Sequence, residues 1–221
     1  MYKNAGYDPN KSFVPINRAY LAPLVFVAGN DVKATSMKEF VALARTQPDS
    51  LNYGSSGQGS LPHFATEAFF RIAGIHLLHI PFKGDAQALT EVLGGRVSVV
   101  FSGVLAAQPH IKSGKLRALA VTSAQRISAL EGVPTLREAG FPSYEDTIWA
   151  GFFAPAGTPK ALAEFLNKEI TATLNTPELR THLDASGAEV APQSLADYAA
   201  FIQGEVVRYA KLVKDLNFKL D

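Results

Sequence analysis

The chain has 221 residues, 47% of them hydrophobic, and its 21 Lys and Arg residues nearly balance its 20 Asp and Glu residues. This composition excludes a disordered chain, and at roughly 100–200 residues per domain the length allows one large domain or two small ones. A net charge of +1 without a basic cluster excludes a nucleic-acid-binding face. The absence of cysteine excludes disulfides, thiolate metal sites and a cysteine nucleophile.

The opening residues predict neither a secretion signal nor a membrane helix. Residues 1–13 lack the charged and apolar regions of a signal peptide and predict an irregular arm. The apolar run 19–28 contains Pro23 and is shorter than the roughly 18 residues that span a bilayer. As written, such a chain is expected to stay in the cytoplasm.

A buried strand and a capped helix follow this arm. The apolar run 23–28, closed by a Gly-Asn pair, predicts the strand. Ser36 and Glu39 have the spacing of a capping box, in which each side chain binds a free backbone N–H at the helix start. Pro48 is expected to end that helix.

Between residues 51 and 121, short apolar runs alternate with helical segments. Such alternation indicates βαβ units, a parallel sheet and strand-to-helix loops along one sheet edge, where ligands bind. The predicted strands are 51–53, 76–80, 97–101 and 116–121, the helices are 60–73, 85–93 and 104–113, and the loops are 54–59, 81–84 and 102–103.

The remainder of the chain changes character. Residues 122–144 contain several Gly and Pro breakers, and a strand is predicted at 149–154. Thr158 as N-cap before Pro159 predicts a helix start. Further helices are expected from residue 177 and from a Ser194 cap through residue 216.

The loop after the 51–53 strand is the main candidate for binding an anion. Glycines let the backbone approach a ligand closely, and the following helix N-terminus offers N–H groups and a positive dipole end. The spacing fits neither a phosphate loop nor a dinucleotide fingerprint, and a Gly/Ser-rich turn that only caps a helix is the alternative. The candidate ligand-binding residues are Ser55, Ser56, Gly57, Gly59 and Ser60, together with His63 one helical turn after the loop.

The next loop repeats this arrangement with Lys83, Gly84 and Asp85. Lys83 is either a ligand contact or a surface lysine, and Asp85 is expected to cap its helix. Trp149, the single tryptophan, is either a core anchor or a lid over a ligand.

A hydrolase is the main alternative to a binding protein. The nucleophile-elbow pattern Gly-x-Ser-x-Gly fails at both Ser55 and Ser56, although His63 is placed to face the loop. His76 and His79, three apart on the predicted strand, are expected to face opposite sides and not to share a metal. The sequence therefore favours a protein without a metal, a cofactor or a catalytic site.

Long sequence words resemble the solute-binding proteins of tripartite tricarboxylate transporters, the Bug receptors. The resemblance covers essentially the whole chain. The words include LNYGSSGQGS from residue 51, HIPFKGDAQA from 79, LGGRV from 93, PHIKSGKLRALAVTS from 109 and WAGFFAPAGTP from 149.

This resemblance implies a periplasmic-binding-protein-like α/β fold of the type II Venus flytrap class, which closes over a small carboxylate. It implies a parallel-rich sheet with flanking helices, a complete second lobe at 23–146, and a truncated first lobe formed by 1–22 and 147–221. The loops at 55–60 and 83–86 are then the ligand edge of the second lobe. Ser102 and Gly103 stand where relatives commonly have Asp-Asn, which is expected to change the accepted far end of the ligand.

The resemblance also implies a periplasmic location, membrane partners in a transporter, and a ligand that is a small organic acid. A first lobe lacking its opening part is expected to be covered by a second copy, giving a homodimer. Two other functions remain open at this point: a hydrolase using Ser56 or Ser60 with His63, and a scaffold without any ligand.

Overall fold

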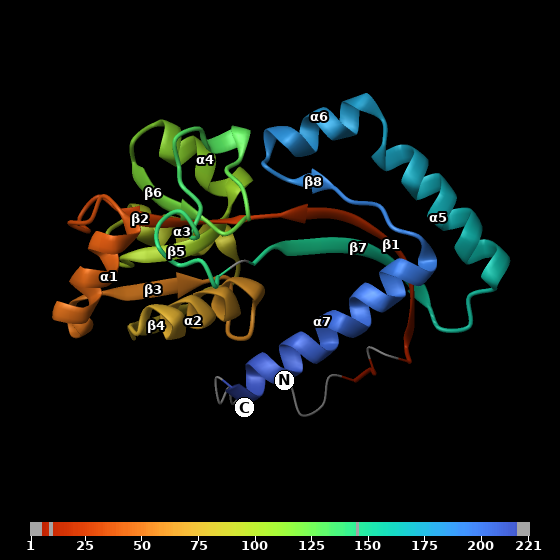
Figure 1. Cartoon of the computed structure of the whole chain (residues 1–221), viewed down its shortest axis with the longest axis horizontal. Helices are drawn as coiled ribbons and strands as arrows, with labels where there is room; N and C mark the ends of the chain where they lie inside the picture. Colours follow the sequence, from red (N-terminus) through yellow and green to blue (C-terminus); the bar gives the residue numbers. More distant parts are fainter. Residues whose placement is uncertain (1–5, 9–10, 145, 216–221) are drawn as a thin grey trace. The chain divides into compact units, whose positions relative to one another are not determined.

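The computed structural model describes residues 6–8, 11–144 and 146–215 and divides into two compact units (Figure 1). Unit 1 comprises Met1–Leu21, Trp149–Asp184 and Ala188–Asp221, and unit 2 comprises Ala22–Ile148 with Ala185–Gly187. The sequence placed its two boundaries after residues 22 and 146. The assignment of these units to a truncated first lobe and a complete second lobe remains a prediction.

Unit 2 contains a five-stranded sheet in the order β4-β3-β5-β2-β6. β3 is parallel to β4 and β5, whereas β2 runs antiparallel to both β5 and β6. The sheet is therefore parallel-rich, with one reversed strand. The strands are β2 (Leu24–Gly29), β3 (Asn52–Ser55), β4 (Leu78–Pro81), β5 (Val99–Gly103) and β6 (Leu116–Val121).

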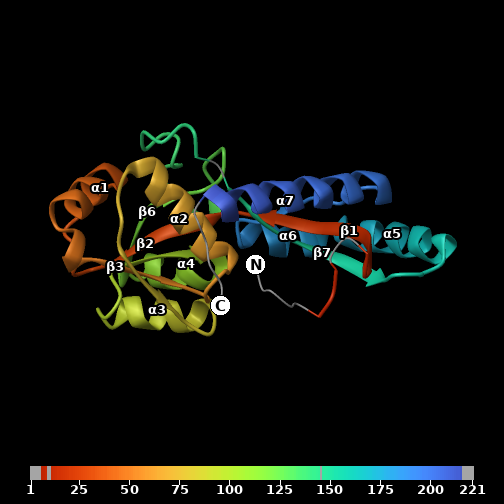
Figure 2. The same ribbon diagram turned by 90° about the horizontal axis from the view of Figure 1, so that it is seen from below.

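Helices cover both faces of this sheet. α1 and α2 pack on one face and α3 on the other (Figure 2), and α4 packs on the α3 face. Alternate β2 side chains divide between the faces, with Phe26 in one core and Val25 and Val27 in the other. The helical elements are α1 (Met37–Thr46), η1 (Pro48–Ser50), α2 (Leu61–Ala73), α3 (Asp85–Leu93), α4 (Val104–Lys112) and η2 (Ser128–Leu130).

The predicted capping box at the start of α1 is confirmed, and Thr35 extends it. The Glu39 N–H donates to Ser36 Oγ over 3.2 Å, as expected. The Glu39 carboxylate accepts from the backbone N–H and the hydroxyl of Thr35, each over 2.7 Å. These bonds and, to a smaller extent, one from the Ser36 backbone N–H lower the pKa of Glu39. The cap therefore spans one residue more than the sequence spacing predicts.

The described residues of unit 1 form a three-stranded sheet in the order β7-β1-β8, of which β1 and β8 are antiparallel. The sequence predicted β7 but not β1, because the β1 residues do not alternate cleanly between apolar and polar. The strands are β1 (Phe13–Ala22), β7 (Ile148–Pro155) and β8 (Glu189–Val190), and the helices are α5 (Lys160–Leu174), α6 (Pro177–Ala185) and α7 (Leu195–Asp215).

Helix starts in unit 1 follow the predicted chemistry in part. Ser194 accepts the Asp197 N–H over 3.1 Å at the start of α7, whereas residue 216 lies outside the described residues. Thr158 was wrongly predicted to cap α5. Pro159 is the N-cap residue, and the Thr158 hydroxyl donates to the Pro155 carbonyl over 2.8 Å.

The buried side chain of Asn17 ties β1 to α5. Its amide donates to the Asn167 carbonyl over 3.1 Å and to Thr171 Oγ1 over 2.7 Å, and its oxygen accepts the Gln193 N–H over 2.9 Å. A fully buried amide is tolerated in this core because these bonds satisfy it. Across the described segments, no helix has the length and apolar character that crossing a membrane requires.

Candidate functional site

Three loops meet at one edge of the unit 2 sheet, because β3, β4 and β5 are parallel and end at the same side. The Phe82 N–H donates to the Ser55 carbonyl over 3.0 Å and joins the first two loops. The Asp85 carboxylate joins the second loop to the third at Ser102 and Gly103. The structure thus brings the predicted residues of unit 2 to one edge.

The turn between β3 and α2 depends on two glycines with positive φ. Gly57 has φ 135° and Gly59 has φ 73°, conformations that residues with a Cβ rarely adopt. A Cβ on Gly57 would also lie 3.4 Å from the Phe82 carbonyl oxygen of the neighbouring loop. The glycine content of this segment therefore shapes a close turn against the second loop.

The α2 N-terminus offers a ligand fewer N–H groups than the sequence analysis expected. Ser60 is the N-cap, and its Oγ accepts the His63 N–H over 3.4 Å. Pro62 has no N–H, so at most the Leu61 amide remains available in the first turn. The Gly/Ser-rich segment therefore caps helix α2. The positive end of the α2 dipole still attracts an anion at this terminus.

The start of α3 is more open. Its N-cap is Gly84, with φ 124° and no side-chain cap. The first turn begins with Asp85 and continues through Gln87, whose side-chain oxygen accepts the Lys83 N–H over 3.0 Å. Lys83 is exposed at the same loop. This terminus therefore combines uncapped backbone amides with a nearby ammonium group.

Asp85 was wrongly predicted to cap its own helix. Its Oδ2 accepts from Ser102 Oγ over 2.9 Å and from the Gly103 N–H over 3.0 Å, so it binds the turn before α4. Its other oxygen, Oδ1, is buried and has no hydrogen-bond partner among the described residues. Burial raises the pKa of Asp85, and the bonds from Ser102 and Gly103 oppose that rise.

His63 faces the loop, as predicted, and is 4% exposed. Its Nδ1 accepts the Gly59 N–H over 3.0 Å, and its ring stacks on that of His79 with centroids 3.7 Å apart. Burial, and next the charge of a protonated His79, lower the pKa of His63 to about 3. Burial lowers the pKa of His79 to about 4. Both imidazoles are therefore neutral near pH 7.

The contact between Ser55 and His79 was not predicted from the sequence. Ser55 Oγ lies 2.7 Å from His79 Nε2, although the two residues are 24 positions apart. Ser55 ends β3 and His79 lies on the neighbouring strand, so strand pairing was the signal that could have found this contact. His76 precedes β4 and does not belong to the strand, contrary to the prediction.

This geometry does not assemble the Ser60–His63 pair of the alternative hydrolase. Ser60 Oγ and His63 Nδ1 both accept backbone N–H groups, and neither binds the other. The Ser55 hydroxyl, which does meet a histidine, is completely buried and out of reach of a substrate. In the described part of the chain, no three His, Cys, Asp or Glu side chains gather closely enough to hold a metal ion.

Trp149 lies in unit 1, and the other predicted residues lie in unit 2. Its indole N–H donates to Glu205 over 2.8 Å, and its ring packs edge-on against Phe201 at 5.4 Å. Trp149 is thus anchored to α7. A contact between Trp149 and a ligand remains a prediction.

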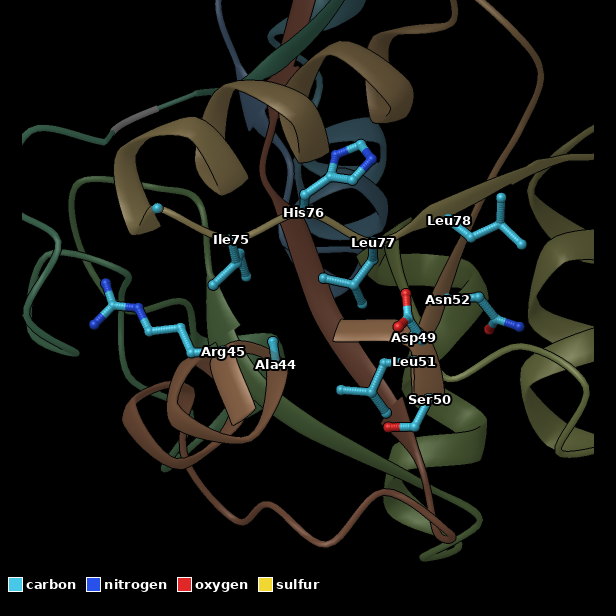
Figure 3. Close-up of a pocket in the computed structure, with 11 residues that line it drawn as sticks. Ala44, Arg45, Asp49, Ser50, Leu51, Asn52, Ile75, His76, Leu77 and Leu78 are labelled. Atoms are coloured by element: carbon cyan, nitrogen blue, oxygen red, sulfur yellow. The ribbon is translucent and has the colours of Figure 1, made fainter. Parts of the chain in front are cut away.

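A groove of about 570 Å³ opens at the other end of β3 (Figure 3). Residues from the end of α1 and η1 form one side, and the segment between α2 and β4 forms the other. It contains none of the predicted binding residues. Its lining is Ala44, Arg45, Asp49, Ser50, Leu51, Asn52, Gly74, Ile75, His76, Leu77 and Leu78.

Comparison with known proteins identifies the family. The model of the tripartite tricarboxylate transporter family receptor matches residues 1–218. A protein encoded in the tcbD-tcbE intergenic region of Pseudomonas sp. (strain P51) is 33% identical over 96% of this chain and 63% of its own length. Protein BugT of Bordetella pertussis is 30% identical over 97% of this chain and 66% of its own length. The chain therefore spans less than two thirds of these curated relatives.

Solved structures agree with this assignment. An R. palustris protein solved with adipate has a TM-score of 0.92 and 33% identity, covering 98% of this chain and 73% of its own. The periplasmic binding protein BugD has a TM-score of 0.90 and 32% identity over 98% and 73%. MatC of Rhodopseudomonas palustris, solved with malate, has a TM-score of 0.87 and 28% identity over 96% and 73%. The chain belongs to the tripartite tricarboxylate transporter receptor family and has the fold of its periplasmic binding proteins.

Proposed function

We propose that this protein is a solute receptor that binds a small organic acid at the loop edge of unit 2. The observation that carries the proposal is the convergence of the Gly57–Gly59 turn, the uncapped α3 start and Lys83 at one sheet edge. Relatives solved with adipate and with malate support the ligand class. The chain matches only part of the length of its relatives, so the function of a whole receptor is part of this proposal.

Backbone amides supply most of the proposed contacts. The first-turn N–H groups of α3 point along the helix axis toward the edge, and the dipole adds about 0.3–1 kcal/mol for an exposed anion. Ser56 and Ser60 add hydroxyl groups, and Lys83 adds a positive charge. A carboxylate matches these donors because it accepts several hydrogen bonds in one plane.

By the same resemblance, we propose a periplasmic location and membrane subunits of a tripartite transporter as partners. The family model describes receptors of that transporter, and a further relative is described as a periplasmic transporter. Such a receptor releases its ligand unchanged. Saturable binding without turnover is therefore expected.

A thermal-shift screen with matched ligand pairs tests this proposal. Malate and adipate are compared with their neutral diamides, which keep the length but lose the charge. An acid at about 100 times its dissociation constant should add about 2.7 kcal/mol of stability. A shift with an acid and none with its diamide is expected. Equal shifts with both, or none with any acid, would overturn the proposal.

A further inference from the structure

Two histidines from different elements lie beneath the Gly57–Gly59 turn. His63 is on α2 and His79 is on β4. Their rings are stacked, with centroids 3.7 Å apart and planes inclined by 20°. Tyr53 continues the stack below His79 at 4.8 Å and 20°. The Tyr53 hydroxyl donates to Glu67, which fastens the far end of the stack to α2.

Each histidine is connected to one glycine of the turn. His63 Nδ1 accepts the Gly59 N–H directly, over 3.0 Å. His79 acts through Ser55, whose Oγ lies 2.7 Å from His79 Nε2 and accepts the Gly57 N–H over 3.2 Å. The same hydroxyl also lies 3.0 Å from the Gly57 carbonyl oxygen. Both glycines with positive φ are therefore held from below.

The bond to His63 requires an unprotonated ring, and the contact between His79 and Ser55 is compatible with one. Because His63 Nδ1 accepts a hydrogen bond, its proton must be on Nε2. Ser55 has one hydroxyl proton, so it either donates to Gly57 and accepts from His79 Nε2–H, or donates to His79. A neutral His79 can form both arrangements, and the second requires a neutral ring. Burial favours this state, because it disfavours a charged imidazole.

We propose that His63 and His79 are positioning residues that hold the Gly57–Gly59 turn in its ligand-binding shape. They act through the backbone and through Ser55 and do not touch the ligand, since His63 is 4% exposed and Ser55 is fully buried. The proposal rests on the proposed function for its effect on affinity. It assigns to His63 a different role from the direct ligand contact that the sequence suggested.

Paired substitutions separate this role from simple core packing. His63→Asn keeps an acceptor near the position of Nδ1 but removes the ring, whereas His63→Phe keeps a stacking ring but removes the acceptor. His79→Gln and His79→Phe form the equivalent pair at the second position. A packing role requires the ring, and a positioning role requires the acceptor.

Calorimetric titration with malate and with adipate gives the first readout. His63→Phe and His79→Phe should weaken binding about tenfold, which corresponds to one lost hydrogen bond of about 1.4 kcal/mol. The Asn and Gln variants should stay within about threefold of the wild type. Weak binding by the Asn and Gln variants with normal binding by the Phe variants would overturn the proposal.

Amide hydrogen exchange without ligand gives a second readout, which holds even if no acid binds. The Gly59 amide should exchange about tenfold faster in His63→Phe than in His63→Asn. Ser55→Ala, a small change that should still fold, should speed exchange at Gly57 and not at Gly59. Unchanged exchange at both glycines in these variants would refute the positioning role. If the predicted faster exchange is observed but no acid binds, only the proposed function is refuted.

Discussion

Asp85 is the residue whose charge bears most directly on the choice of ligand. Its carboxylate occupies the start of α4, where it accepts from Ser102 and Gly103, and its second oxygen has no partner among the described residues. An anion at a helix N-terminus is favourable, but it repels a second anion nearby. At the proposed site, an ionised Asp85 is therefore expected to disfavour a ligand that places a negative charge beside the start of α4.

Removing this charge should change the selectivity of the protein. Asp85→Asn keeps an acceptor for the Gly103 N–H, so the turn should remain. We expect the affinity for malate, a dianion, to rise about tenfold, or about 1.4 kcal/mol. The affinity for its monoamide should change less. Calorimetry with both ligands measures the difference, and an equal change for the two would contradict this account.

In unit 1, Gly151 provides a test of how closely single residues are packed. A Cβ at this position would lie 2.1 Å from the Tyr198 hydroxyl oxygen and 2.7 Å from the Asn17 carbonyl oxygen. Gly151→Ala should therefore lower the free energy of unfolding by about 3 kcal/mol. Gly204, inside α7, has open space around it, so Gly204→Ala should raise the free energy of unfolding by about 0.5–1 kcal/mol. Denaturant unfolding of both variants checks the sign, and a stable Gly151→Ala would refute the packing argument.

The stacked pair His63 and His79 predicts that the stability of the fold decreases in acid. The pKa of His63 is lowered to about 3 and that of His79 to about 4, below the ordinary value of 6.5. Above pH 6.5 the imidazoles are neutral in both the folded and unfolded states. As the pH falls from 6.5 toward 4, only the unfolded chain takes up these protons, so stability should fall by up to about 1.4 kcal/mol per pH unit for each histidine.

Denaturant unfolding between pH 7 and pH 4.5 measures this slope. Other groups also titrate in this range, so the double variant His63→Asn/His79→Gln serves as the reference. The wild type should lose stability more steeply than the variant. Parallel slopes would mean that the two rings already take up protons in the folded state.

Elements with local signals were the most predictable from the sequence. The helix predicted at 85–93 is observed as Asp85–Leu93, and the one predicted at 60–73 begins one residue later. The direction of β2 was not predictable, because a strand buried on both faces has the same apolar pattern in either direction. β1 was missed for want of a clean alternation.

The residues of the candidate site also differ in how well the sequence predicted them. Gly57, Gly59 and Gly84 were predicted because backbone positions with positive φ favour glycine, which is visible in the sequence. The Ser55–His79 contact was not found, because it depends on the register between two strands. Asp85 was misassigned because the N-cap preference describes its own helix, whereas the third loop, distant in sequence, supplies its partners.

For the whole molecule, the sheet edge formed by β7 motivates the expected homodimer. Among the described residues, β7 is the terminal strand of its sheet, and its Phe152 and Phe153 are 47% and 42% exposed. Open strand edges with apolar side chains favour pairing with another strand. We propose that a second copy covers this edge. Light scattering at micromolar concentration should give twice the mass of one chain, and Phe152→Asp should give a monomer. A wild-type monomer would refute the dimer.

An amide NMR titration of the whole chain with malate and adipate tests the central claim most directly. Saturable shifts are expected at residues 56–61 and 83–87, the loops at the ends of β3 and β4. Shifts confined to the groove between residues 44–52 and 74–78 (Figure 3), or no saturable shift with either acid, would contradict a carboxylate site at this edge.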